Sequence, residues 1–508
     1  MHLLLCAPIF TNHMVLQRNK NINVWGMCRN NAQVSVSLGD TQVSVAAKDG
    51  AFHAVLPPQN AGGPYEMTVS DNFGGSISFK DVMIGEVWLA GGQSNMEWEL
   101  KDCTGGLAEI ENAEKTANEA DIRFYYTKKN AYINERFFLD ERDNSWSTLN
   151  NKDAMRAWSA VGYFFAKKLA AELGCAVGII GCNWGGTSAS AWLSRRMLET
   201  DTDTKTYVDE YDNAINTKSF DEYLAEREEY FNYLAVWEPK IGEFYAKNPK
   251  GTWKEAQEYA GESRYPEPLG PLSPFRPYGL YETMLKRCCP YSLAGFIYYQ
   301  GESDDHKPNA YYKLMKKLIE QWRTDWNDDT LPFLFVQLTS FGIEDDTGNC
   351  RWPLIREAQA RVHKTTANTG LAVILDCGEY GDIHPKDKKT VGDRLSLQAL
   401  YHVYKKIDAP DSYGLFYKTH IREGSRVKIS FDYSASGFEV KGGEIKGFEV
   451  AGADKEFFAA SAEISGENII VYSDKVKIPE YVRYCWANYC DVTVFSKKTG
   501  IPLAPFRA

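Results

Sequence analysis

Hydrophobic and polar residues alternate in short runs over the first part of the chain. In residues 34–38 and 42–45 every second side chain is apolar, which is the period of a strand with one buried face. Turn signals separate these and neighbouring runs at a spacing of about ten residues. They include Gly39-Asp40, Asp49-Gly50 and Gly74-Gly75. Short strands at this spacing are typical of sandwiches, so the pattern predicts an N-terminal β-sandwich domain over residues 1–82.

From residue 83 the pattern changes to strand-length apolar runs that alternate with helical segments. The predicted strands are residues 87–90, 122–126, 177–182, 295–299, 333–338 and 371–375. The clearest predicted helix, residues 159–173, carries apolar side chains at helical spacing. Such alternation predicts a parallel sheet with helices on both faces. We therefore expect an α/β domain over residues 83–408.

Two further segments depart from this alternation. Residues 199–286 begin as a charged helical stretch and become rich in proline and glycine. An insertion of this length and composition predicts a lid or rim over a site; the alternative is a solvated decoration without a role. Residues 409–508 return to short strands separated by glycine turns, which predicts a C-terminal β-sandwich-like domain.

Composition excludes several classes of partner. The chain has 508 residues, 44% hydrophobic residues and a formal net charge of -11, so nucleic acid and anionic membranes are poor partners. No apolar run approaches the roughly 18 residues that span a bilayer. Eleven cysteines without a C-x-x-C pair indicate reduced thiols. With no signal-like start, we expect a bacterial cytoplasmic protein, or an exported one if a signal has been removed. The oligomeric state stays open.

The first stretch that predicts chemistry is residues 85–98. An apolar strand reaches Gly91-Gly92, and Ser94 follows two residues later. The glycines permit a sharp turn that would present Ser94 at the carboxyl end of a strand, where open α/β sheets bind ligands. A serine there is a nucleophile if a base reaches its hydroxyl. The alternative is an ordinary helix N-cap serine.

Two more stretches follow predicted strands of the same sheet. Gly185 and Gly186 lie just after the strand that ends at residue 182, and their backbone N–H groups are suited to an oxyanion site. After the strand at 295–299, Gln300 could donate its amide to an oxyanion and Glu302 could orient a neighbour or hold a loop by hydrogen bonds. The alternatives are a plain βα turn and an acidic surface turn.

The fourth stretch, residues 381–385, supplies a base. His384 lies on a loop past a strand end, close to Asp382 and fixed by Pro385, as expected of a general base with a carboxylate partner. Of the eight histidines, His306 is the only rival. Because all four stretches follow strands of one parallel sheet, they are expected to gather at its carboxyl edge.

These four stretches resemble the signature blocks of the SGNH hydrolases. The G-Q-S-N-M run at residues 92–96 and the Q-G-E-S run at 300–303 look like those of the sialate O-acetylesterase family of carbohydrate esterases. The similarity covers nearly the whole chain. Further similar segments are residues 8–18, 63–65, 281–284 and 502–507. The resemblance implies an SGNH-type parallel sheet within the α/β domain.

The resemblance also implies roles for individual residues. Ser94 would be the nucleophile and His384 the general base. Gly186 and Gln300 would join the Ser94 N–H in the oxyanion hole, with Gly185 as the alternative to Gly186. The asparagine that is common in the third block of the superfamily is missing here, which leaves the role of Gln300 in question.

One departure concerns the acid that orients the histidine. The superfamily acid usually lies three residues before the histidine, where this chain has Gly381. Asp382, two residues before, is the candidate. Glu302, Asp376 or a backbone carbonyl are the alternatives.

The predicted function is a serine esterase that hydrolyses O-acetyl esters on carbohydrates through an acetyl-enzyme on Ser94. By resemblance, a 9-O-acetylated sialic acid is the first expected substrate, and acetylated xylan or mannan oligosaccharides are the alternative. A non-catalytic carbohydrate-binding protein is the alternative from another class. No cofactor or metal is expected. A sialate carboxylate calls for a basic side chain, and the candidates in rim segments are Arg195, Arg196, Arg264 and Arg276.

Overall fold

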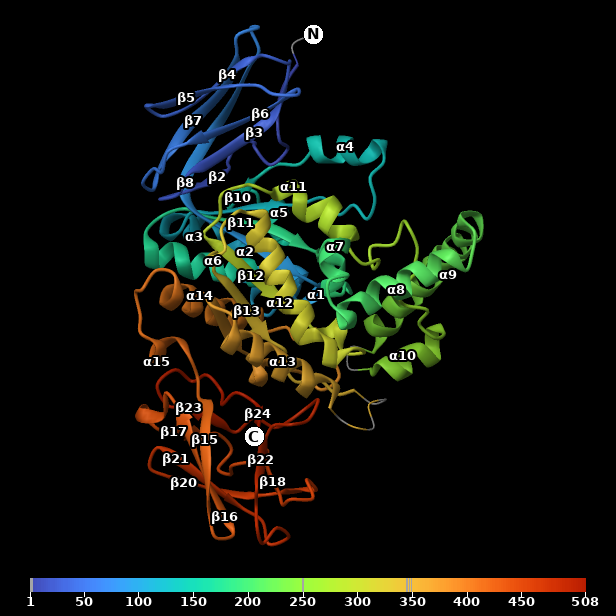
Figure 1. The fold of residues 1–508 in the computed structure, drawn as a ribbon, viewed down its shortest axis with the longest axis vertical. Coiled ribbons are helices and arrows are strands. Elements are labelled where there is room, and N and C mark those ends of the chain that lie inside the picture. The colour runs from blue at the N-terminus through green and yellow to red at the C-terminus, as the bar shows by residue number, and fades with distance from the viewer. Residues whose placement is uncertain (1–2, 249–250, 344–345, 347, 349) are drawn as a thin grey trace.

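The fold has three tiers along its longest axis (Figure 1). The computed structural model describes residues 3–508 except 249–250, 344–345, 347 and 349. An N-terminal β unit lies at one end, a mixed α/β unit lies in the middle, and a C-terminal β unit lies at the other end. No helix in the described part of the chain has the length and apolarity needed to cross a bilayer.

The N-terminal unit consists of two β-layers. One is the antiparallel sheet β1-β3-β6, and the other contains β4, β5, β7 and the start of β8. The strands are β1 (Leu4–Cys6), β2 (Val15–Gln17), β3 (Ile22–Cys28), β4 (Gln33–Leu38), β5 (Thr41–Ala46), β6 (Ala51–Leu56) and β7 (Gly62–Asp71). Alternate residues of β4 and β6, such as Val34, Val36 and Ala54, are fully buried. The predicted two-residue period therefore faces a core.

Strand β8 (Ser76–Gly92) joins the first two tiers. Its first part pairs antiparallel with β7 and parallel with β2, and its second part pairs parallel with β11 and β12 of the central sheet. The expected limit between residues 82 and 83 falls inside this strand. Val82, Ile84 and Val87 are all fully or almost fully buried in one continuous core, so the two units share a backbone and a hydrophobic interior.

The central strands run in the order β10-β9-β11-β8-β12-β13-β14. They are β9 (Ile122–Tyr126), β10 (Ser147–Thr148), β11 (Val177–Asn183), β12 (Gly295–Tyr299), β13 (Phe333–Gln337) and β14 (Thr369–Val373). All neighbours from β9 to β14 are parallel, and β10 is antiparallel to β9. The α/β prediction is confirmed, and the whole sheet is mixed because antiparallel N-terminal strands extend it through β8.

The helices of the central tier pack in pairs. The predicted helix at 159–173 forms α6 (Ala160–Leu173), capped by Ser159 and ended by Gly174 with a left-handed backbone. It packs on α14 (Lys388–His402), while α12 (Pro308–Asp325) packs on α13 (Arg351–Thr365). The shorter helices are α1 (Ser94–Glu97), α2 (Gly106–Glu111), α3 (Ala113–Glu119), α4 (Glu135–Arg142), α5 (Lys152–Arg156), α7 (Arg195–Leu198), α11 (Lys286–Cys288) and α15 (Ala409–Ser412).

The insertion projects to one side of the central tier (green in Figure 1). It contains α8 (Thr202–Asn216), α9 (Phe220–Lys247) and α10 (Trp253–Ala260). Trp237 of α9 meets Trp253 of α10 edge to face, with ring centroids 5.8 Å apart. After α10 the chain returns to the sheet, where the Tyr265 hydroxyl donates to the Gly186 carbonyl at 3.2 Å. The insertion therefore contacts the Gly185-Gly186 turn, which the sequence predicts to lie at the oxyanion site.

The C-terminal tier consists of three small sheets, ordered β15-β16-β21-β20, β17-β23 and β19-β18-β22-β24. The strands are β15 (Phe416–Glu423), β16 (Arg426–Asp432), β17 (Phe438–Val440), β18 (Phe448–Ala451), β19 (Phe457–Ala459), β20 (Ser461–Ser465), β21 (Asn468–Tyr472), β22 (Tyr481–Tyr484), β23 (Val494–Ser496) and β24 (Phe506–Arg507). Their core also contains Val373 and Leu375, at the end of β14, so this tier packs directly on the central sheet.

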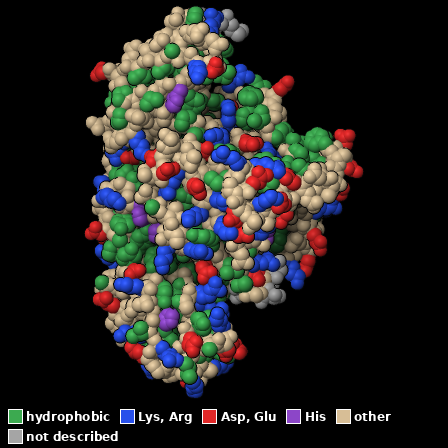
Figure 2. Space-filling model, viewed as in Figure 1, with side chains coloured by type: hydrophobic (Ala, Val, Ile, Leu, Met, Phe, Trp, Pro, Cys, Tyr) green, Lys and Arg blue, Asp and Glu red, His purple; other side chains and the backbone are tan. Residues whose placement is uncertain are grey.

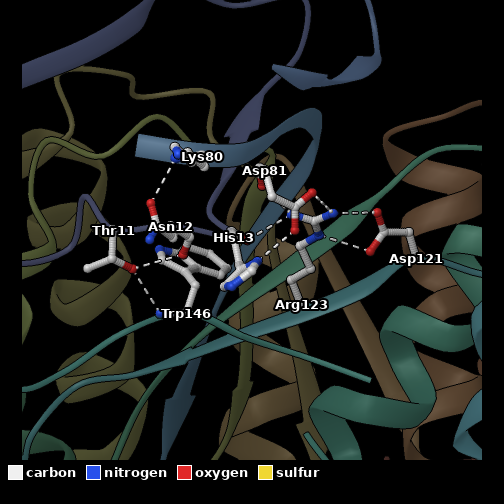
Figure 3. A network of polar contacts seen from close by, with 8 residues as sticks. All are labelled: Thr11, Asn12, His13, Lys80, Asp81, Asp121, Arg123 and Trp146. Atoms are coloured by element: carbon white, nitrogen blue, oxygen red, sulfur yellow. Dashed lines mark hydrogen bonds and ion pairs between the residues drawn. The ribbon is translucent and has the colours of Figure 1, made fainter. Parts of the chain in front are cut away.

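A polar network fixes the N-terminal tier to β9 (Figure 3). Arg123, which is 5% exposed, donates to the carboxylates of Asp81 at 3.1 Å and Asp121 at 3.0 Å. It also donates to the His13 carbonyl at 3.1 Å. The Nδ1 atom of His13 lies 2.6 Å from Asp81 Oδ2. One guanidinium thus joins the turn at His13 and strand β8 to strand β9 of the central sheet.

Charges elsewhere on the visible face are mixed in sign. Figure 2 shows lysine and arginine side chains interspersed with aspartate and glutamate over the central tier. A surface of this kind provides no extended basic face for a polyanion.

We expect Arg123→Met to lower the free energy of unfolding by about 1–2 kcal/mol. Removing one member of a buried ion pair is costly, but Asp81 and Asp121 are about a third exposed, so water can solvate the carboxylates left behind. Urea unfolding measures the change. The matched control is Lys152→Met, which removes a solvent-exposed partner of Glu114 and should cost less than about 0.5 kcal/mol. Equal losses in the two variants would contradict the role of Arg123.

Candidate active site

Ser94 lies directly past the carboxyl end of β8. Gly92 has φ +136°, and a Cβ added there would lie 2.1 Å from the Tyr299 carbonyl oxygen, so only glycine fits this turn. The next residue, Gln93, donates its N–H to the same carbonyl at 3.1 Å. The close approach of β8 and β12 turns the chain so that α1 begins at Ser94.

His384 comes from the loop before α14 and meets Ser94 from 290 residues away in sequence. Its Nε2 lies 2.8 Å from Ser94 Oγ, which is hydrogen-bond distance. The imidazole stacks on Trp98, with ring centroids 4.9 Å apart and an interplanar angle of 23°. The stacking holds the ring plane while its edge faces the serine. A neutral imidazole in this position can accept the serine proton.

Burial keeps the His384 ring in its neutral form. Desolvation lowers the pKa of His384 from 6.5 to about 4; Asp382 opposes this change, and Lys388 and Lys386 reinforce it. A positive charge on the ring is disfavoured because the surroundings replace water and carry two ammonium groups. Near neutral pH the ring is therefore a base.

Asp382 is near His384 but contacts its backbone. The Asp382 carboxylate accepts the His384 backbone N–H at 2.8 Å. Its distance to Nδ1 of the ring is 3.9 Å, which is too long for a hydrogen bond. The same carboxylate lies 3.1 Å from Lys386 Nζ. Among the alternatives, Asp376 is bound by both guanidinium nitrogens of Arg394, at 2.5 and 2.8 Å.

A buried polar network lies beneath the Ser94–His384 pair. Asn95 donates to Glu302 at 2.5 Å and to the carbonyl of Ile383 at 3.0 Å, and it accepts from Lys388 Nζ. Glu302 is 6% exposed and Lys388 is 0% exposed. Burial raises the pKa of Glu302 and lowers that of Lys388 to about 8. Glu302 therefore reaches the residue before His384 through one asparagine.

The Gly185-Gly186 turn lies beside Ser94. A Cβ added to Gly185 would lie 3.3 Å from Ser94 Cβ. The Gly185 N–H donates to a carboxylate oxygen of Glu97 at 2.6 Å, so it already binds an anionic oxygen. Gly186 has φ +73° and its carbonyl accepts from Tyr265.

The Gln300 amide is used within a second buried network. Its Nε2 donates to Asp304 at 2.6 Å and to the Thr187 carbonyl at 3.4 Å, while Oε1 accepts from Tyr311 at 2.9 Å. Asp304 is fully buried and needs these donors. To bind an oxyanion, the Gln300 amide would therefore have to give up a hydrogen bond that it now donates to Asp304 or Thr187. The rival base His306 is exposed and packs edge-on against Tyr207.

Sequence reasoning assigned no role to four residues at this site. Asn95, Glu97 and Trp98 belong to the same motif as Ser94, so their proximity was a usable signal. Lys388 gave none, because a single lysine outside any motif is usually a solvated surface charge.

The comparisons with known proteins agree with one another. Residues 272–395 match the family described as carbohydrate esterase, sialic acid-specific acetylesterase. The sialate O-acetylesterase of Mus musculus is 27% identical over 460 residues, or 82% of this chain and 79% of the relative. That of Homo sapiens is 26% identical over 426 residues, or 77% and 70%. The structure of a carbohydrate acetylesterase from Xanthomonas citri matches with TM-score 0.77, at 29% identity over 99% of both chains.

These likenesses define a carboxylic ester hydrolase of the carbohydrate esterase class. Within that class, residues 272–395 match the sialic acid-specific acetylesterase family, and most of the chain is similar to sialate O-acetylesterases. The resemblance that the motifs predicted is confirmed, and so is the prediction that the protein is an esterase.

The lowered pKa of His384 predicts that activity persists to an unusually low pH. The base is neutral above its pKa and is lost as the pH falls through it, so kcat/KM for acetyl-ester hydrolysis should hold below pH 6.5 and fall near about 4. The measurement is a pH–rate profile, with circular dichroism at each pH to show that the protein stays folded. A limit centred at 6.5 or above would contradict the desolvation of the ring.

Proposed function

We propose that the protein is a serine carbohydrate O-acetylesterase in which Ser94 is the nucleophile and His384 the general base. The observation that carries the proposal is the 2.8 Å contact between Ser94 Oγ and His384 Nε2. It joins two sequence-predicted residues at the carboxyl edge of a parallel sheet. The same arrangement supports an SGNH-type assignment for the central tier.

In the first step, His384 takes the proton of the Ser94 hydroxyl as its oxygen attacks the acetyl carbonyl. The developing oxyanion accepts hydrogen bonds from the Ser94 N–H and from the Gly185-Gly186 turn. The Gly185 N–H becomes available when Glu97 gives up its present hydrogen bond. His384 then gives the proton to the departing sugar oxygen, and the acetyl group stays on Ser94.

In the second step, water replaces the sugar. His384 takes a proton from the water, which attacks the acetyl-enzyme and passes through a second oxyanion at the same donors. Collapse returns the proton to Ser94 and releases acetate. Asp382 supports both steps indirectly, because its bond to the His384 backbone N–H shapes the loop that carries the ring.

The substrate in this proposal is an O-acetylated sugar. The names of the curated relatives make a 9-O-acetylated sialic acid the first candidate. One observation favours neutral acetylated oligosaccharides as the second: three of the four arginines proposed for a sialate carboxylate already have acidic or carbonyl partners. Arg195 binds Asp212 and Glu199, Arg264 binds Glu229, and Arg276 donates to the Ala131 carbonyl.

Ser94→Ala should retain the wild-type fold and lose acetate release by at least about 10⁴-fold, because the nucleophile and its covalent intermediate are gone. Acetate release from acetylated sugars measures the loss. Ser145→Ala, at an exposed serine, is the matched control. If Ser94→Ala kept its activity, the covalent mechanism would be refuted. Sugar binding by a wild-type protein without esterase activity would support the non-catalytic alternative.

Asp382 offers a test of how the histidine is oriented. In a triad whose aspartate binds the imidazole directly, Asp→Asn costs about 10⁴-fold in kcat. Here an asparagine oxygen can still accept the His384 backbone N–H, so Asp382→Asn should cost less than about tenfold. His384→Ala, measured beside it, should cost as much as Ser94→Ala. A loss of about 10⁴-fold in Asp382→Asn would show instead that the carboxylate binds the ring during turnover.

A further inference from the structure

A cavity of about 550 Å³ lies between the insertion and the loops of the central sheet. The insertion contributes α9 and the segment that follows α10, and the sheet contributes the segment after β9 and the turn after β11. The lining residues that carry the argument are Lys129, Asn130, Trp184, Arg227, Glu267 and Phe275.

The cavity adjoins the catalytic pair through the Gly185-Gly186 turn. Trp184, which lines the cavity, immediately precedes Gly185, whose added Cβ would lie 3.3 Å from Ser94 Cβ. Phe275, on the insertion side, comes within 3.1 Å of a Cβ added to Gly186. The cavity therefore lies next to the turn that faces Ser94. A chain of linked sugars with one unit at Ser94 can place a neighbouring unit here.

The lining combines aromatic surface with polar atoms that make no hydrogen bond in the protein. Trp184 and Phe275 offer apolar area suited to the face of a sugar ring. Glu267 Oε1, Arg227 Nε and Asn130 Nδ2 are buried and make no hydrogen bond within the protein. Glu267 is 6% exposed. Since buried polar groups are rarely left unpaired, these two donors and one acceptor are suited to ligand hydroxyls.

The charges of the lining are balanced. Lys129 is paired with Glu97, and Arg227 Nε lies 3.6 Å from the Glu267 carboxylate. No cation that lines the cavity within the described residues is left without a carboxylate. Arg227 also lies over the Phe231 ring, 4.6 Å from its centroid. A ligand carboxylate would have to compete with these carboxylates for the cations. Neutral hydroxyls can bind Arg227 and Glu267 without breaking their ion pair.

We propose that this cavity is a subsite for a neutral sugar unit linked to the acetylated sugar at Ser94. The inference rests on the proposed esterase function and specifies its substrate class as neutral acetylated oligosaccharides. Glu267 and Arg227 bind hydroxyls of the neighbouring unit, and Trp184 and Phe275 contact its ring.

The test compares Glu267→Gln and Arg227→Met with the wild-type enzyme on three substrates. These are an acetylated xylo-oligosaccharide, 9-O-acetylated sialic acid and p-nitrophenyl acetate, which has no second sugar unit. Each variant should lose at least about tenfold more kcat/KM on the oligosaccharide than on p-nitrophenyl acetate, mainly through KM. The matched control is Glu226→Gln, an exposed residue next to Arg227 on α9 that is paired with Lys218. It should leave all three rates unchanged.

Binding separates failure of the subsite from failure of the esterase. Unacetylated xylotetraose, titrated calorimetrically into Ser94→Ala protein, should bind, and the added Glu267→Gln change should weaken binding by about tenfold. If the wild-type protein hydrolyses none of the esters, the proposed function fails, whatever the titration shows. If esters are hydrolysed and the subsite variants lose equally on all substrates, the subsite is refuted. A preference for the sialic acid that Arg227→Met abolishes would overturn the neutral-sugar assignment.

Discussion

The candidate active site depends on an asparagine placed between a buried glutamate and a buried lysine. Asn95 accepts from Lys388 and donates to Glu302 and to the carbonyl of Ile383. Three separate chain segments, after β8, after β12 and before α14, are thereby joined at one side chain. Leaving one of these buried groups without its hydrogen bond would cost about 1–3 kcal/mol, so the loop that carries His384 is held close to Ser94. The Ser94–His384 contact depends on this network as well as on the stacking of the imidazole.

The same network explains why Asp382 can act on His384 through its backbone and not through its ring. The stacking of His384 on Trp98 sets the plane of the ring, and the bonds of Asn95 and Asp382 to the backbone set the position of the loop. A carboxylate hydrogen-bonded to Nδ1 is then not needed to hold the ring toward Ser94. Without such a bond the charged ring gains little stabilisation, in agreement with the lowered pKa of His384.

Much of this fold could be predicted from local sequence, and the limits of prediction have physical causes. Apolar runs and glycine turns located Ser94 and His384, because the carboxyl ends of parallel strands must share an edge. The expected domain limit at 82–83 lies inside β8. The apolar pattern of a buried strand is the same whether the strand belongs to one sheet or to two. The engagement of Gln300 with Asp304 and the pairing of Lys388 with Asn95 depend on contacts between distant segments. Short-range pattern does not encode such contacts.

One ion pair connects the cavity to the proposed oxyanion site. Lys129 lines the cavity and binds Glu97, and Glu97 in turn accepts the Gly185 N–H. In the proposed mechanism that N–H serves the oxyanion, so Glu97 must move before the acetyl carbonyl can be activated. In this proposal, a sugar unit that fills the cavity beside Lys129 lies next to the ion-pair partner of the carboxylate that now accepts the Gly185 N–H.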